Sequence, residues 1–105
     1  MKKDDLNGRS LRADLGLPSD WSVRQNYHNQ NKKENSNFGY VISSPESVRD
    51  GGQRWKIRGE YNDDGEVVAL GWWGSGGNFS EISYDYLLQV LRQAIIEDYG
   101  EEAFE

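Results

Sequence analysis

The chain has no cysteine, a single histidine and no long apolar run. Without cysteine, neither a disulfide framework nor a thiolate metal site can form. No apolar segment approaches the length needed to span a bilayer, and none follows the two lysines near the start as it would in a signal peptide. We therefore expect a cytoplasmic protein that makes no membrane contact.

The only histidine, His28, lies in a polar stretch. A transition-metal site or a histidine-activated nucleophile would depend on that one residue. The carboxylates of Asp63, Asp64 and Glu66 are close in sequence, but their segment is too short for an EF-hand loop and is typical of a hairpin turn. We therefore expect no catalytic residues, no metal and no cofactor, so the protein would not be an enzyme.

Apolar residues make up only 35% of the chain, which is low for a globular protein. Four tryptophans, six tyrosines and three phenylalanines compensate, because each aromatic side chain can bury a large apolar area. At 105 residues the chain is long enough for one core. We expect one domain over residues 10–100, a disordered N-terminus over 1–9 and an acidic tail over 101–105.

Apolar and polar residues alternate in four segments, which predicts four strands. The first two strands are expected over 21–27 and 38–43, with a mobile loop over the polar residues 28–37 between them. The next two are expected over 53–61 and 66–73, joined by a turn that contains Asp-Gly, a strong hairpin signal. Strands connected in this order form an antiparallel meander.

Apolar spacings of three and four residues predict one long helix over 82–99. Asn78 and Glu81 are spaced as in a capping box, and Gly100 is placed to end the helix. A short helix is predicted near the N-terminus, capped by Ser10. The expected fold class is α+β: an antiparallel four-stranded meander sheet with a long C-terminal helix packed on one face and a short N-terminal helix.

The Asp64-Gly65 turn decides which side chains share a face of the sheet. If the turn has an even number of residues, Trp72 faces the core and Trp73 faces outward. An odd turn would bury several unpaired cations, which is costly, so we predict an even one. The predicted core face holds Trp55, Ile57, Gly59, Tyr61, Val68, Leu70 and Trp72. The predicted outer face holds Arg54, Lys56, Arg58, Glu60, Val67, Ala69, Gly71 and Trp73. Trp73 would lie beside Arg54 or Lys56, depending on the register.

The glycine-rich segment 74–80 follows a predicted strand and precedes a predicted helix, as phosphate-binding loops do. It lacks the Lys and Ser/Thr of the P-loop, and Phe79 takes the place of the last glycine in G-x-G-x-x-G. Residues 59–91 also hold six acids and no Lys or Arg, which would repel an anion. We interpret the segment as a linker from the sheet to the helix.

Charge is sorted along the chain. Residues 1–58 hold 11 of the 12 Lys and Arg residues, whereas residues 59–105 hold 11 of the 18 acids. This predicts one positive and one negative surface, an arrangement that promotes selective encounter with a charged partner.

Two surfaces are candidates for binding. The first is the outer sheet face, where cations surround an aromatic residue: Arg54, Lys56, Arg58 and Trp73. The second is the outer side of the long helix, where Tyr86, Val90 and Ile96 depart from the core stripe. These helix residues would either form a contact surface or widen the packing of the helix on the domain.

We expect a non-catalytic module that binds another protein, and small size and class suggest an inhibitor, an immunity protein or a phage antagonist by analogy. It would use either the Trp73 face or the acidic C-terminal half, whose charge suits a partner with a basic surface. One alternative is nucleic-acid binding through Arg54, Lys56, Arg58 and Trp73, which the net charge of −6 disfavours. Another is a sugar or other small molecule bound at Trp73.

Overall fold

The computed structural model describes residues 1–31, 33–45, 54–73 and 83–104, and it has the predicted α+β fold. Four antiparallel strands form one sheet in the order β1-β2-β3-β4, so each strand pairs with its neighbour in sequence. The described elements are η1 (Lys3–Asp5), α1 (Gly8–Leu15), β1 (Ser22–Asn29), β2 (Ser36–Ser43), β3 (Arg54–Tyr61), β4 (Val67–Trp73), α3 (Tyr84–Asp98) and η2 (Glu101–Phe104).

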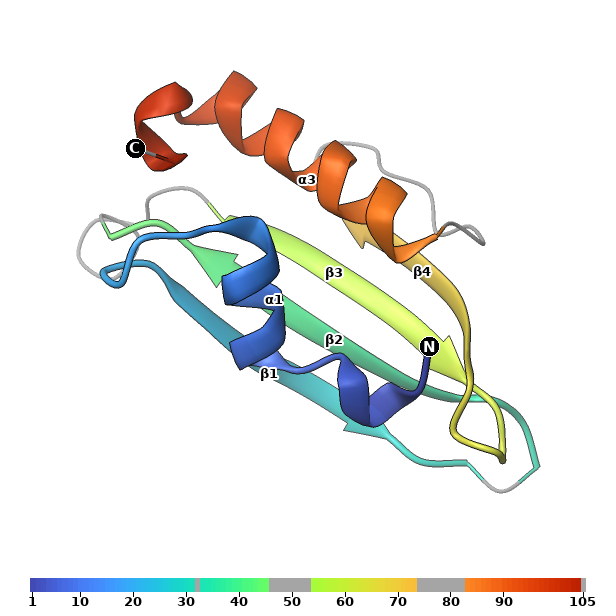
Figure 1. Ribbon diagram of the computed structural model, residues 1–105. Coiled ribbons are helices and arrows are strands. Elements are labelled where there is room, and N and C mark those ends of the chain that lie inside the picture. The colour runs from blue at the N-terminus through green and yellow to red at the C-terminus, as the bar shows by residue number, and fades with distance from the viewer. Residues whose placement is uncertain (32, 46–53, 74–82, 105) are drawn as a thin grey trace.

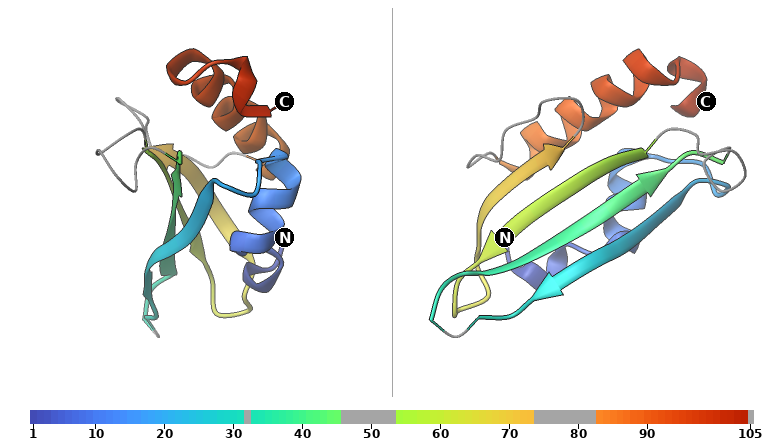
Figure 2. Two further views of the ribbon diagram at one scale, coloured as in Figure 1. Left: turned by 90° about the vertical axis from the view of Figure 1, so that its left-hand side faces the viewer. Right: turned by 180° about the vertical axis from the view of Figure 1, so that it is seen from behind.

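The two α-helices lie on the same face of the sheet, which we call the inner face (Figures 1 and 2). α1 packs nearest β1, and α3 packs nearest β4. Side chains of α3 tie the helices together: Arg92 donates a hydrogen bond to the carbonyl oxygen of Leu15 at 2.9 Å, and the Tyr84 hydroxyl donates one to the Asp14 carboxylate at 2.7 Å. No described helix covers the other face, the outer face, which is toward the viewer in the right-hand view of Figure 2.

The core lies between the helices and the inner face, and aromatic rings fill much of it. Trp21 and Trp55 stack with ring centroids 5.5 Å apart, and Tyr99 meets Trp21 edge to face at 4.9 Å. Leu87 and Leu91 of α3 are fully buried in the same cluster. A few large rings therefore supply the apolar area that the low hydrophobic content of the sequence limits.

The β3–β4 hairpin has the predicted faces along most of its length, but a different turn. Tyr61 pairs with Val67, so five residues separate the two, an odd number rather than the predicted even one. A β-bulge then adds Val68 to β4, and from the pair Glu60 and Ala69 onward the pairing has the predicted parity. Val67, expected on the outer face, therefore packs against the core in place of Val68.

The turn itself is stabilised by one side chain. The Asn62 Oδ1 atom accepts hydrogen bonds from the backbone N–H groups of Asp64 and Glu66, both at 3.0 Å. Gly65 has a φ of 79°, in the left-handed region that glycine enters without strain. The Asp-Gly signal thus located the hairpin correctly, although it did not reveal the loop length.

The α1 helix is capped by Asn7 rather than by Ser10. The Asn7 Oδ1 atom accepts from the Ser10 N–H at 2.9 Å, and the Ser10 Oγ atom accepts from the Asn7 N–H at 3.0 Å. This reciprocal pair satisfies two backbone donors, so the helix begins three residues earlier than the predicted cap allowed. Gly16, with a φ of 75°, ends it.

The N-terminal residues, which we expected to be disordered, contact the body of the domain. Leu6 is completely buried in the core. The Lys3 N–H donates to the Gly65 carbonyl oxygen at 2.8 Å, and the Lys2 ammonium lies 2.9 Å from the Glu66 carboxylate. These contacts place a short segment along the start of β4, where an edge strand offers unpaired backbone groups.

The α3 helix begins at Tyr84, and the Ser83 side chain caps it by accepting from the Tyr86 N–H at 3.1 Å. The predicted capping pair, Asn78 and Glu81, lies outside the described residues, as does the glycine-rich segment 74–80. After Gly100 the chain forms η2, in which Ala103 is buried. None of the described helices is long and apolar enough to cross a membrane.

The polar loop between β1 and β2 is shorter than expected. Strand pairing extends to Asn29 and Asn37, whose side-chain amides are hydrogen-bonded at 3.1 Å. His28, expected in the loop, is therefore a strand residue, and its ring is hydrogen-bonded to the Tyr61 hydroxyl. These ends of the strands project beyond α1 and α3 (Figure 1).

Candidate functional site

The predicted cations lie together on the outer face of the sheet. Within β3, Arg54 and Lys56 are exposed and Arg58 is partly buried, while Trp55 and Ile57 between them are buried. This alternation confirms that the three cations share a face opposite the core. The β3 strand is central in the sheet, so the cations lie in the middle of the outer face rather than at its edge.

A row of paired residues crosses all four strands through Lys56. Arg24 of β1 pairs with Val41 of β2, Val41 pairs with Lys56, and Lys56 pairs with Trp73 of β4. Because paired residues point to the same face, Arg24 joins the predicted cations. With strands about 4.8 Å apart, the row spans about 14 Å.

Of the two predicted neighbours of Trp73, the structure selects Lys56 by backbone pairing. The side chain of Trp73 lies outside the part of the chain that is described, so the predicted contact between its ring and a cation stays a prediction. The backbone pairing alone puts position 73 at the end of the row, on the same face as Lys56.

In the sequence, Tyr27 alternates in phase with Trp21 and Val23, a pattern that favours the core side of β1. The structure puts Tyr27 on the outer face instead. A β-bulge adds Asn26 to the strand: Gln25 pairs with Tyr40, and the next pair is Tyr27 with Gly39. The extra residue reverses the alternation beyond it, so the Tyr27 side chain shares a face with Arg58, which also pairs with Gly39. The bulge therefore brings an aromatic ring to the cations.

Gly39 is what allows the Tyr27 ring to lie against the sheet. A Cβ atom at position 39 would come within 2.2 Å of Tyr27 Cε1 and 2.5 Å of Asn26 Oδ1. No side chain larger than hydrogen fits there unless the ring moves. The ring lies beside a hollow of about 200 Å³, lined by Asn26, Tyr27, Lys56, Ile57 and Arg58. We call this hollow the Tyr27 pocket.

The outer face is positively charged among the described residues. It carries Arg24, Arg54, Lys56 and Arg58, and one carboxylate, Glu60. Within the described ranges, neither Arg24 nor Lys56 forms a hydrogen bond or an ion pair, so no described residue neutralises either charge. The outer face thus combines cations with an aromatic ring, although the whole chain is acidic.

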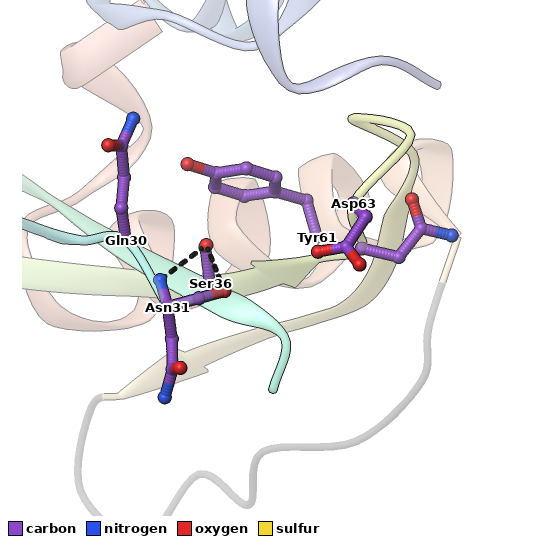
Figure 3. Close-up of a pocket in the computed structure, with 6 residues that line it drawn as sticks. Gln30, Asn31, Ser36, Tyr61 and Asp63 are labelled. Atoms are coloured by element: carbon purple, nitrogen blue, oxygen red, sulfur yellow. Dashed lines mark hydrogen bonds between the residues drawn. The ribbon is translucent and has the colours of Figure 1, made fainter. Parts of the chain in front are cut away.

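A larger, polar cleft lies at one end of the sheet, between the β1–β2 and β3–β4 loops (Figure 3). Its volume is about 490 Å³, and the described residues that line it are Gln30, Asn31, Ser36, Tyr61, Asn62 and Asp63. Most of these polar groups are already used: Ser36 Oγ accepts from the Asn31 N–H at 2.9 Å, and Asn62 Oδ1 holds the turn. The cleft therefore offers few free donors or acceptors, and we do not assign it a ligand.

A separate hollow lies next to the polar cleft and is lined in part by Lys3, His28 and Tyr61. The Lys3 ammonium is 4.7 Å from the centre of the Phe38 ring, and burial lowers the pKa of Lys3. The Tyr61 hydroxyl is hydrogen-bonded to the His28 ring. Across the described residues, no three metal-ligating side chains come together.

The outer side of α3 is the other candidate surface from the sequence. Tyr86 is 54% exposed, and with Val90 it lines a shallow apolar groove that also contains Trp72 and Glu97. Ile96 is partly buried and does not line this groove. The groove therefore contains only two of the three residues predicted for this surface, Tyr86 and Val90, and no cation among the described residues lines it.

Comparisons with protein-family models, with curated proteins and with solved structures found no match for this chain. The residues themselves are therefore the only evidence for a site. Sequence reasoning identified Arg54, Lys56 and Arg58 but missed Arg24 and Tyr27. Strand order and alternation together would have added Arg24, whereas nothing in the local pattern indicates the bulge that redirects Tyr27.

Proposed function

We propose that the protein is a non-catalytic module that binds another protein through the outer face of its sheet. The observation that carries this proposal is the row from Arg24 to position 73, with two cations that have no partner among the described residues. Such a face matches an acidic surface on the partner.

The size of the charged area supports a protein partner rather than a long polyanion. The cations occupy three successive rows of the sheet, and the next row contains Glu60. Beyond it, the turn carries Asp63 and Asp64. A nucleic acid strand that extended past the cations would meet these carboxylates and an overall charge of −6. A compact acidic patch on a partner protein would contact the cations without reaching these carboxylates.

The binding face can be tested by capture of partners from a lysate of the source cell treated with nuclease. Arg24→Glu/Lys56→Glu reverses two charges on the outer face. The matched control Arg9→Glu/Lys33→Glu has the same net charge but changes exposed residues of α1 and the β1–β2 loop. We expect a protein that the wild type and the control capture and the outer-face variant does not. Identical captured sets from all three proteins would refute the proposal.

A second candidate uses the acidic C-terminal half and a partner with a basic surface. It is favoured by the exposed Tyr86, which lies in an apolar groove with Glu97 on its border. In the same experiment, Tyr86→Ala/Glu97→Gln would lose the captured protein, whereas Arg24→Glu/Lys56→Glu would retain it. The reverse result favours the outer sheet face.

A further inference from the structure

We infer that the Tyr27 pocket is the anchor point of the outer face, and that it takes a single carboxylate group from an acidic segment of the partner. This inference rests on the proposed function and names the group that the face recognises. The inference assigns a binding role to Asn26 and Tyr27, which lie at the β1 bulge on the outer face.

The dimensions of the pocket fit one side chain. Its volume of about 200 Å³ is below the range of about 300–1,000 Å³ that is typical of small-molecule sites. The Tyr27 ring forms one wall and is held against the backbone of Gly39. Gly71, which pairs with Arg58 on the β4 side, has no side chain to fill the space. The pocket is therefore suited to an Asp or Glu side chain rather than to a cofactor.

The lining offers several hydrogen-bond donors suited to an anion. Lys56 contributes an ammonium group, Arg58 a guanidinium group and Asn26 a side-chain amide, and none of the described lining residues is a carboxylate. Lys56 and Arg58 are two residues apart on the same face of β3, a separation of about 7 Å along the strand. A carboxylate between them can accept from both side chains, and Tyr27 shields these hydrogen bonds from solvent on one side.

The anchor is distinguished from general charge attraction by a pair of matched variants. Lys56→Gln removes a charge from the pocket lining, and Arg24→Gln removes a charge from the same row outside it. Gly39→Ala changes no charge but displaces the Tyr27 ring.

The probe is a fluorescein-labelled glutamate-rich peptide, and its affinity is measured by fluorescence anisotropy. An oligothymidylate is measured in parallel. Circular dichroism and urea midpoints establish that each variant is folded.

We expect Lys56→Gln and Gly39→Ala to weaken peptide binding about tenfold, and Arg24→Gln only about twofold, because charged hydrogen bonds in a partly desolvated site exceed exposed charge attraction. Equal losses for Lys56→Gln and Arg24→Gln, with none for Gly39→Ala, would overturn the anchor but leave the proposed function standing. Failure of the wild type to bind the peptide, whether or not it binds the oligothymidylate, would overturn both.

A second measurement does not depend on any variant. In the wild-type protein, titration with the peptide should shift the side-chain NH2 resonances of Asn26 and the backbone resonances of Tyr27 and Arg58 in a nitrogen–proton correlation spectrum. Shifts confined to α3 and η2, with none at these three residues, would overturn the anchor.

Discussion

Two glycines in neighbouring strands provide a sharp test of the packing. Gly59 of β3 pairs with Phe38, and Gly39 of β2 pairs with Tyr27, so each glycine lies opposite an aromatic ring. A Cβ atom at position 59 would be 2.4 Å from the Phe38 Cζ atom, and one at position 39 would be 2.2 Å from Tyr27 Cε1. The two clashes are of similar size, but one lies in the core and the other on the outer face.

We expect Gly59→Ala to be much more destabilising than Gly39→Ala. Phe38 is completely buried, so its ring has no space to move into, and overpacking of this kind costs about 1–3 kcal/mol. The smaller entropy of the unfolded alanine chain offsets about 0.4–1 kcal/mol of this. With the middle of each range, the net loss is about 1.3 kcal/mol, which corresponds to a Tm lower by about 5–10 °C in a domain of this size. Tyr27 is only partly buried and can rotate into solvent, so Gly39→Ala should cost about 0.5 kcal/mol or less.

Urea unfolding followed by tryptophan fluorescence, with thermal unfolding by circular dichroism, measures both variants. Because both glycines lie within central strands, the intrinsic effect of alanine is the same and cancels in the comparison. Equal losses of stability in the two variants, or a Gly59→Ala protein as stable as the wild type, would refute the assignment of Phe38 to the core and Tyr27 to the outer face.

Two predictions concern pH. Tyr84→Phe removes the hydrogen bond to Asp14 and should lower the free energy of unfolding by about 1 kcal/mol at neutral pH. Burial and this hydrogen bond raise the pKa of Tyr84, so the difference should hold below the unfolded tyrosine pKa of about 10 and diminish as the pH rises above it, as urea midpoints across alkaline pH would reveal. Lys2 lowers the pKa of Glu66, so Glu66→Gln should be slightly less stable than the wild type at pH 7. That difference should vanish as the pH falls below the carboxylate range, and a difference that persists in acid or in high salt would contradict the ion pair.

Local sequence patterns determined the fold class, the four strands, the position of the β3–β4 hairpin and the faces of Arg54, Lys56 and Arg58. These features follow from side-chain periodicity and turn chemistry, which act over a few neighbouring residues. The low hydrophobic content and the 13 aromatic residues likewise indicated a core rich in aromatic rings, and the stacked Trp21 and Trp55 belong to it.

Only the tertiary structure decided the two bulges and the packing of the N-terminus. A bulge depends on which partner the strand pairs with. Periodicity therefore favoured the core for Tyr27, and the cost of burying unpaired cations favoured an even turn before β4. Leu6 is buried because it packs into the core between the helices and the sheet. Residues near Leu6 in the sequence do not indicate this burial. The pocket beside Tyr27 requires a glycine on the next strand, and so it arises from residues that the chain brings together only when it folds.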